Sequence, residues 1–137
     1  MEYRKLKSLA GKNNFAQMIG LEILEVEEGY ARGRVRMDER LTNIYEGMHG
    51  GCIYTMADTV TGIAASTYGN YVTTIDGKIN YLLPVKDTMY VYCLAKVKRQ
   101  GGRIGVYEAE ITNDRNEVLA TADFTYYRTS EKIPDSI

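Results

Sequence analysis

The chain has 137 residues, a length that fits one domain with a single hydrophobic core. Its 17 basic and 18 acidic side chains give a formal net charge of −1, which excludes a general field that would attract nucleic acid or an anionic membrane. No apolar stretch approaches about 20 residues, and the N-terminus lacks the apolar core of a signal peptide, so we expect a cytoplasmic protein without a transmembrane helix. In that compartment Cys52 and Cys93 are expected to be buried free thiols, with a disulfide between them as the alternative.

The N-terminal 37 residues predict a helical segment followed by a hairpin. Up to about Ile19 the apolar residues recur at loosely helical spacing, and Gly20 follows as a stop. Residues 21–28 and 31–37 then alternate between apolar and polar side chains, with Gly29 between the two runs. This pattern is typical of a β-hairpin with one face in solvent.

The rest of the chain predicts one buried helix and four strands. Residues 50–66 are apolar on nearly every side, which indicates a buried helix. Period-two alternation returns in four segments, 71–83, 88–99, 103–112 and 117–128, before a tail at 130–137 that we expect to fray. The last segment is expected to bury Val118, Ala120, Ala122, Phe124 and Tyr126. A single nearly apolar helix requires a sheet around most of its surface. We therefore predict one α+β domain over residues 1–137, with a strongly curved antiparallel sheet wrapped around a central helix.

The junction between loop and central helix is a candidate site for an oxyanion. Gly50 and Gly51 stand where the first helical turn leaves backbone N–H groups without partners, and glycine lets a substrate approach that backbone closely. Asn43 and His49 lie just upstream and can position a carbonyl or a water. A glycine pair is also a common helix start, and a single histidine there is often a cap, so these residues alone do not establish a site.

Asp58 is the unusual residue of the central helix. It lies about two turns from the helix start among apolar neighbours, where a carboxylate is costly to bury and aspartate is a poor helix former. Two penalties at one position indicate a function. The alternative is a structural aspartate that faces solvent or accepts hydrogen bonds from Thr55, Thr59 or Thr61.

The segment from residue 43 to residue 58 reads N-x3-G-x-H-G-G-x6-D, and its fixed positions are Asn43, Gly47, His49, Gly50, Gly51 and Asp58. Together with the order of elements from about residue 15 to 128 and the segment TIDGKINYLLP at 74–84, it resembles the hot-dog acyl-CoA thioesterases of the phenylacetate-degradation type. This PaaI-like group includes human THEM-type enzymes. The motif is fairly specific to this branch but carries no information on the acyl group. The resemblance implies a hot-dog fold and hydrolysis of an acyl-CoA.

The resemblance also implies a role for each matching residue. Asp58 stands where the family has its general base or nucleophile, and the N–H of Gly50 stands where the thioester oxygen is polarised. Asn43 and His49 match positions that orient the thioester or the attacking water, and Thr74 matches one that holds the water or the carboxylate. In the family the aspartate and the glycine come from different subunits. A homodimer is thus the expected minimum active unit, and a homotetramer the expected assembly.

Hydrolysis of a thioester needs one base and one oxyanion site, and the chain has a single histidine and no spaced cysteine pairs that would indicate a metal. We therefore expect neither a metal nor a cofactor, because coenzyme A is part of the substrate. Because coenzyme A carries phosphates, we expect cationic side chains near its binding site. The candidate coenzyme A contacts include Gly51 and Thr73. The basic candidates lie around one predicted hairpin and are Lys96, Lys98, Arg99 and Arg103. Lys78 and Lys86 are further candidates. The alternative is that these cations belong to a solvated strand face.

Two other activities compete with hydrolysis: an acyl-CoA dehydratase of the same fold, and a non-catalytic acyl-CoA-binding module. A dehydratase pairs a histidine with an acid, whereas here the histidine precedes the glycines. A module that only binds a neutral thioester gains nothing from a buried carboxylate. Four side chains are candidates for an acyl pocket that suits medium-chain or aromatic groups: Tyr45, Met48, Tyr54 and Met56. Whether Asp58 attacks directly or through water stays open.

Overall fold

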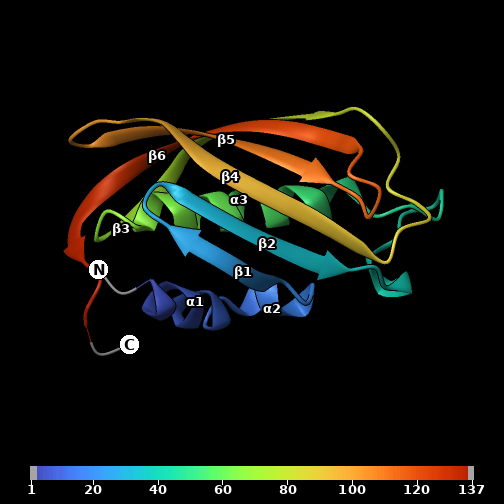
Figure 1. Cartoon of the computed structure of the whole chain (residues 1–137), viewed down its shortest axis with the longest axis horizontal. Helices are drawn as coiled ribbons and strands as arrows, with labels where there is room; N and C mark the ends of the chain where they lie inside the picture. The colour runs from blue at the N-terminus through green and yellow to red at the C-terminus, as the bar shows by residue number, and fades with distance from the viewer. Residues whose placement is uncertain (1–2, 136–137) are drawn as a thin grey trace.

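The computed structural model describes residues 3–135, which form two short helices, a long helix and a six-stranded sheet (Figure 1). A 3-10 turn, η1 (Glu39–Leu41), precedes the long helix. The other elements in chain order are α1 (Arg4–Gly11), α2 (Asn14–Met18), β1 (Glu22–Glu27), β2 (Tyr30–Arg36), α3 (Gly50–Ser66), β3 (Asn70–Tyr81), β4 (Tyr90–Gln100), β5 (Ile104–Thr112) and β6 (Val118–Lys132). Every predicted strand is present, and the predicted helical opening consists of two helices rather than one.

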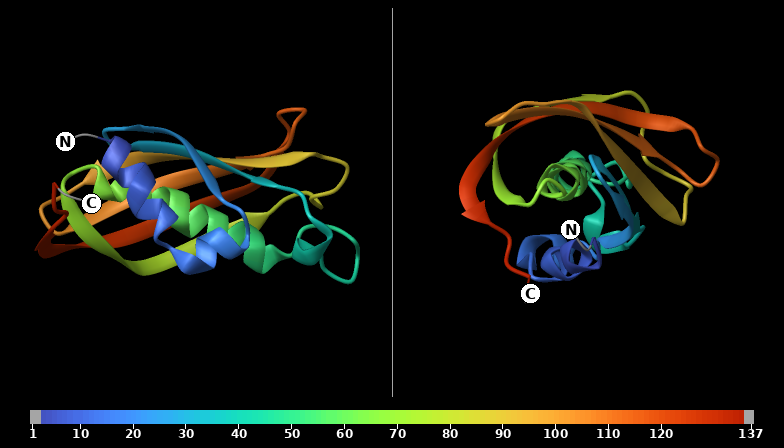
Figure 2. Two further views of the ribbon diagram at one scale, coloured as in Figure 1. Left: turned by 90° about the horizontal axis from the view of Figure 1, so that it is seen from below. Right: turned by 60° about the vertical axis from the view of Figure 1, so that its left-hand side comes forward.

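All neighbouring strands pair antiparallel in the order β1-β2-β4-β5-β6-β3, so β1 and β3 are the edges of the sheet. The sheet is strongly curved and wraps around α3, while α1 and α2 lie across its open side (Figure 2). The predicted α+β hot-dog fold is therefore confirmed. A helix that is apolar on most of its surface is stable in water only when a sheet covers it in this way.

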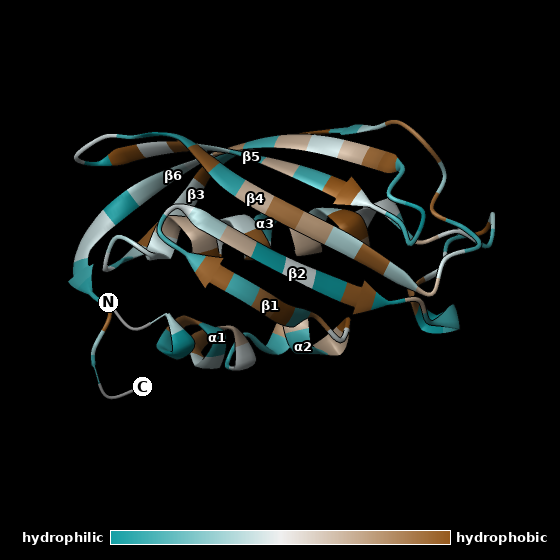
Figure 3. Ribbon diagram, viewed as in Figure 1, coloured by the Kyte–Doolittle hydropathy of each residue, from teal (hydrophilic) through white to brown (hydrophobic). Residues whose placement is uncertain are grey.

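The alternation of side chains decides which face of each strand is buried. In β2 the small or apolar residues Ala31 and Val35 are fully buried, while the intervening arginines point to the convex side. Figure 3 shows the resulting change between hydrophobic and hydrophilic residues along the strands. The turn from β1 to β2 requires Gly29, because its φ is 66° and an added Cβ would lie 2.7 Å from Val97.

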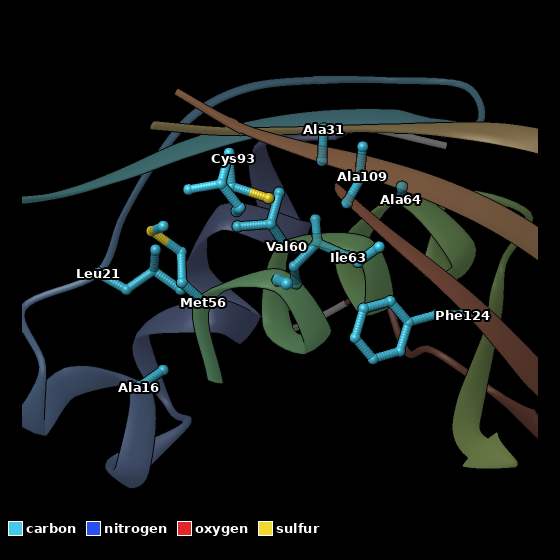
Figure 4. Packing of buried hydrophobic residues seen from close by; sticks show 14 of the residues in the cluster. Ala16, Leu21, Ala31, Met56, Val60, Ile63, Ala64, Cys93, Ala109 and Phe124 are labelled. Carbon is cyan, nitrogen blue, oxygen red and sulfur yellow. The ribbon is translucent and has the colours of Figure 1, made fainter. Parts of the chain in front are cut away.

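The hydrophobic core lies between α3 and the concave face of the sheet (Figure 4). Met56 and Val60 of the helix and Cys93 and Phe124 of the sheet are all fully buried. The helix can approach the sheet closely because the facing residues are small: a Cβ at Gly33 would lie 3.0 Å from Val60 Cγ2. Burial of a side chain as large as Phe124 contributes about 1.5–3 kcal/mol to the stability of this core.

The N-terminal helices pack against α3 and β1 through small apolar residues. Leu6, Ala10 and Ala16 are buried there. The side chain of Asn13 caps α2, since its Oδ1 accepts a hydrogen bond from the N–H of Ala16 at 3.0 Å. The cap fixes the junction between α1 and α2 next to the middle of α3.

The C-terminal strand is longer than expected. β6 continues to Lys132, because the first residues of β3 provide a partner up to the pair Asn70 and Lys132. Ile133 is buried, and its N–H donates to the Gly69 carbonyl at 2.9 Å. The segment predicted to fray from residue 130 is therefore ordered in its first part, and residues 136–137 lie outside the described residues.

Both cysteines are free and buried, which confirms the expected pair of separate thiols. Among residues 3–135 no helix is both long and apolar enough to cross a membrane.

Candidate active site

Asp58 lies on the third turn of α3, and its carboxylate is held from two strands. Its Oδ1 accepts a hydrogen bond from Thr74 Oγ1 of β3 at 2.8 Å and from the Tyr126 hydroxyl of β6 at 2.9 Å. The Tyr126 hydroxyl also lies 2.7 Å from the backbone carbonyl of Asp58. Among the described residues no donor contacts Oδ2, so this oxygen is available to a ligand or a water. The three threonines considered as partners of Asp58 do not fill that role.

The protein environment keeps the phenol of Tyr126 in its donor form. Burial and, next, the negative charge of Asp58 raise the pKa of Tyr126 well above its ordinary value. A protonated phenol can donate a hydrogen bond to the neighbouring carboxylate. Asp58 itself is half-buried and lines a cavity of about 400 Å³, so it is less enclosed than the apolar sequence around it suggests.

The second part of the site is the N-terminus of α3. His49 is the N-cap, and its Nδ1 accepts a hydrogen bond from the N–H of Gly51 at 2.8 Å. In the neutral imidazole the proton is therefore on Nε2. Within residues 3–135 the N–H of Gly50 has no acceptor, whereas its carbonyl accepts a hydrogen bond from the Tyr81 hydroxyl at 2.8 Å. An unpaired N–H at the positive end of a helix is a suitable donor to an oxyanion.

Asn43 organises the loop that leads to this helix start. Its Oδ1 accepts hydrogen bonds from the N–H groups of Tyr45 at 2.9 Å and Gly47 at 3.3 Å. Asn43 and Gly50 line a second cavity of about 590 Å³. Tyr45 and Met48 line this cavity too, whereas Met56 belongs to the core and Tyr54 lies outside its wall.

The two parts of the site do not meet within one chain. Gly50 and Asp58 are eight residues apart on one helix, which corresponds to about 12 Å along its axis. They also line different cavities. Both parts are nevertheless attached to the edge strand β3, because Thr74 contacts Asp58 and Tyr81 contacts Gly50.

A β-bulge makes this common attachment possible. The ladder between β3 and β6 passes from Thr74 to Asp76 without pairing Ile75, so the alternation of side chains shifts by one. Thr74 and Tyr81 are seven residues apart and would otherwise point to opposite faces of the strand. With the bulge both point towards α3.

Four of the basic residues predicted to contact coenzyme A lie outside the two cavities of this chain that Asp58 and Gly50 line. Three of them, Lys96, Lys98 and Arg99, belong to β4 and are exposed. Lys98 forms a surface ion pair with Asp123 at 3.1 Å. Arg103 lines a separate cavity, and none of the four lines the cavities of Asp58 and Gly50. Lys86 does line the Gly50 cavity. Thr73 is exposed and precedes Thr74 on the strand, so it faces away from the carboxylate.

Sequence reasoning missed the two tyrosines that touch the site. The alternation along 117–128 predicted that Tyr126 is buried, and the structure confirms this with 2% exposure. Only the curvature of the sheet brings its hydroxyl to Asp58. Among the described residues no group of three histidine, cysteine or acidic side chains is placed to hold a metal.

Comparison with known proteins finds relatives of similar sequence and similar fold. The acyl-coenzyme A thioesterase PaaI of Escherichia coli is 28% identical over 105 residues, which cover 77% of this chain and 75% of that protein. The solved structure of E. coli PaaI, from the phenylacetic acid degradation operon, has a TM-score of 0.91 at 23% identity and covers 96% of both chains. A hypothetical thioesterase protein of Streptococcus pneumoniae, solved with coenzyme A, has a TM-score of 0.78 at 24% identity, covering 83% of this chain and 92% of that one.

The family match includes the helix start, α3 and most of the sheet. The profile described as the thioesterase superfamily matches residues 45–120, which is more than half of the 137 residues. The chain therefore belongs to the thioesterase superfamily, within its PaaI-like hot-dog branch.

Proposed function

We propose that this protein hydrolyses the thioester of an acyl-CoA, with Asp58 as the central catalytic residue. The observation that carries the proposal is the Asp58 carboxylate, whose Oδ1 is fixed by two hydroxyl donors while Oδ2 has no donor among the described residues. Two fixed donors orient the carboxylate, and the remaining oxygen can take a proton. The E. coli relative is named an acyl-coenzyme A thioesterase, which supports coenzyme A as the thiol.

The reaction needs one water and no other co-reactant. Asp58 removes a proton from a water while the water oxygen bonds to the thioester carbon, and the carbonyl oxygen becomes an oxyanion. The N–H of Gly50 stabilises that oxyanion. When the oxyanion collapses, the C–S bond breaks, and the protonated Asp58 gives its proton to the departing thiolate, which yields free acid and coenzyme A and restores the carboxylate. Direct attack by Asp58 gives the same products through an anhydride, and single-turnover hydrolysis in ¹⁸O-water would label Asp58 only in that case.

A homodimer is part of the proposal, because one chain separates Asp58 from Gly50 by about 12 Å. β3 offers an unpaired edge, and apolar side chains are exposed on it and directly after it, as Ile75 at 54% and Leu82 at 55% exposure illustrate. Such an edge is suited to antiparallel pairing with a second copy. In an antiparallel pair of β3 strands in which Lys78 lies opposite Lys78 of the other copy, the unpaired bulge residue Ile75 is skipped in the register. Tyr81 of one copy then lies opposite Thr74 of the other. The Gly50 of one copy then approaches the Asp58 of its partner.

The remaining expectations are finer parts of the same proposal. We infer a medium-chain or aromatic acyl group, a homotetramer made from two such dimers, and a cytoplasmic location, which two free thiols favour. Met48 and Tyr45 are the candidate acyl or pantetheine contacts near Gly50. Lys86 replaces the β4 cations as the first candidate for a phosphate contact, because it lines the same cavity.

The test measures the release of coenzyme A thiol from a panel of acyl-CoAs by wild type, Asp58→Asn and Asp123→Asn. Asp123 is a matched control, since it is an exposed acid on the opposite face of the sheet. We expect Asp58→Asn to lose about 10²–10⁴-fold in kcat and to retain acyl-CoA binding, because general base catalysis contributes that factor. Asp123→Asn should behave as wild type. Equal release by Asp58→Asn and wild type would contradict the mechanism, and binding without release by wild type would indicate a binding module.

A further inference from the structure

The cavity beside Asp58 has walls that come from distant parts of the sequence. One wall is the face of α3 from Asp58 to Ser66, about 12 Å along the helix axis. Strands β3 and β6 contribute to the same wall. The opposite wall is the junction of α1 and α2, which lies across the open side of the sheet (Figure 2) and contributes Leu9, Ala10, Lys12 and Asn13. The volume of about 400 Å³ is in the range of small-molecule sites.

Gly62 is the unexpected residue in this wall. It lies one turn after Asp58 on the same face of α3, in the interior of a 17-residue helix. Glycine in a helix interior costs about 1 kcal/mol relative to alanine. A reason other than helix stability must account for it.

Neither packing nor backbone conformation requires this glycine. An added Cβ would lie 3.8 Å from Tyr126 Cε1 and 3.9 Å from its hydroxyl, which are ordinary van der Waals distances. Gly33 and Gly77 differ, because a Cβ would lie 2.9 Å from the Glu22 carbonyl in the first case and 2.6 Å from Phe124 in the second. Gly62 also lacks the positive φ that other glycines of this chain adopt. The missing side chain therefore leaves room in the cavity and nowhere else.

We propose that Gly62 determines substrate specificity by leaving space for the acyl group of the thioester. The acyl group would extend from the carboxylate of Asp58 along α3, pass over Gly62 and lie beneath the junction of α1 and α2. The inference rests on the proposed thioesterase activity and adds where a bulky acyl group, medium-chain or aromatic rather than acetyl, would lie and which residue leaves the space for it.

The chemistry of the wall suits an apolar occupant. Asp58 and Lys12 are the charged side chains that line the cavity, and Lys12 is exposed at its rim. The hydroxyl of Ser66 donates to the Gly62 carbonyl at 2.8 Å and is thereby satisfied. Elsewhere the lining of the cavity includes Leu9, Ala10, Ile63 and Val72, which offer apolar contacts.

The experiment compares Gly62→Ala and Gly62→Leu with wild type on acetyl-CoA, octanoyl-CoA and benzoyl-CoA. Gly11→Ala is the matched control, since it adds a methyl to an exposed helix position with nothing within 4 Å. Gly62→Ala should raise Tm by about 2–4 °C, because alanine favours the helix. The same change should lower kcat/KM about tenfold or more for the bulky substrates, since one methylene in a pocket has that effect. Acetyl-CoA turnover should stay within about twofold.

Gly62→Leu should extend the trend, with loss of activity on both bulky substrates and retention on acetyl-CoA. An unchanged ranking of substrates in both Gly62 variants would overturn the inference while the thioesterase function stands. A uniform loss on all three substrates would overturn it as well, because it would indicate a disturbed Asp58 rather than a smaller cavity. The absence of turnover by wild type on every acyl-CoA would instead reject the proposed function itself.

Discussion

Replacing Tyr126 by phenylalanine tests how the carboxylate of Asp58 is positioned. The change removes one hydroxyl, which lies 2.9 Å from Asp58 Oδ1 and 2.7 Å from the Asp58 carbonyl. Phenylalanine keeps the ring and its contacts with Tyr107 at 5.9 Å and Phe124 at 6.1 Å between centroids. The variant therefore isolates the hydrogen bond from the packing of a side chain that is 2% exposed.

The expected loss follows from the strength of a hydrogen bond to a charged group, about 1.5–3 kcal/mol. At 1.36 kcal/mol for each factor of ten, kcat should fall roughly 10- to 150-fold. Thr74 still donates to the same oxygen at 2.8 Å, so the activity should not vanish. The free energy of unfolding should fall by less than about 1.5 kcal/mol, because a water in the open cavity can replace the lost donor.

Steady-state release of coenzyme A thiol measures the effect, with Tyr107→Phe as the control. Tyr107 is also buried, but its hydroxyl donates to Gln100 rather than to Asp58. The raised pKa of Tyr126 means that its phenol stays protonated, so the ratio of wild-type to Tyr126→Phe activity should be constant up to about pH 10. An unchanged kcat for Tyr126→Phe, or equal losses in both variants, would refute the positioning role.

Two further predictions concern assembly and the thiols. Mixing inactive Asp58→Asn with inactive Gly50→Pro, which lacks the N–H at the first helical position, should restore activity, because a mixed dimer contains one site with both groups intact. Activity that never appears after subunit exchange would contradict a shared site. Burial raises the pKa of Cys52 to about 11 and that of Cys93 further, so the native protein at pH 8 should not react with a thiol reagent, whereas the unfolded chain should show two thiols. Rapid labelling of the native protein would show that these cysteines are less protected than the fold implies.

Local chemistry made Asp58 predictable and left its partners open. A carboxylate among apolar helix residues carries a cost that the sequence alone reveals. Thr74 followed only from the resemblance, and its bond to Asp58 at 2.8 Å agrees with the predicted contact. The alternation along β6 predicted burial of Tyr126, but a period of two residues does not tell where a hydroxyl at the end of a long side chain points.

The basic residues of β4 show the limit of charge as a signal. Their clustering at a predicted hairpin was correct, but charge alone does not reveal on which face of a curved sheet the cavities open. The cavities lie beside α3, where Lys86 and Lys12 are the lysines that line them. The sequence named Lys86 only as a further candidate and did not indicate Lys12, since each becomes a neighbour of a cavity through a loop or a helix junction.

The bulge at Ile75 connects the local fold to the proposed assembly. It turns Thr74 and Tyr81 to the same face of β3, so one edge strand contacts both the carboxylate and the helix start. Because these groups are separated by two turns of a rigid helix, folding alone creates two incomplete sites. In the proposed dimer, pairing of the edge strands would complete each site and would also cover the apolar side chains that β3 exposes. Activity and dimerisation should therefore be lost together in this protein.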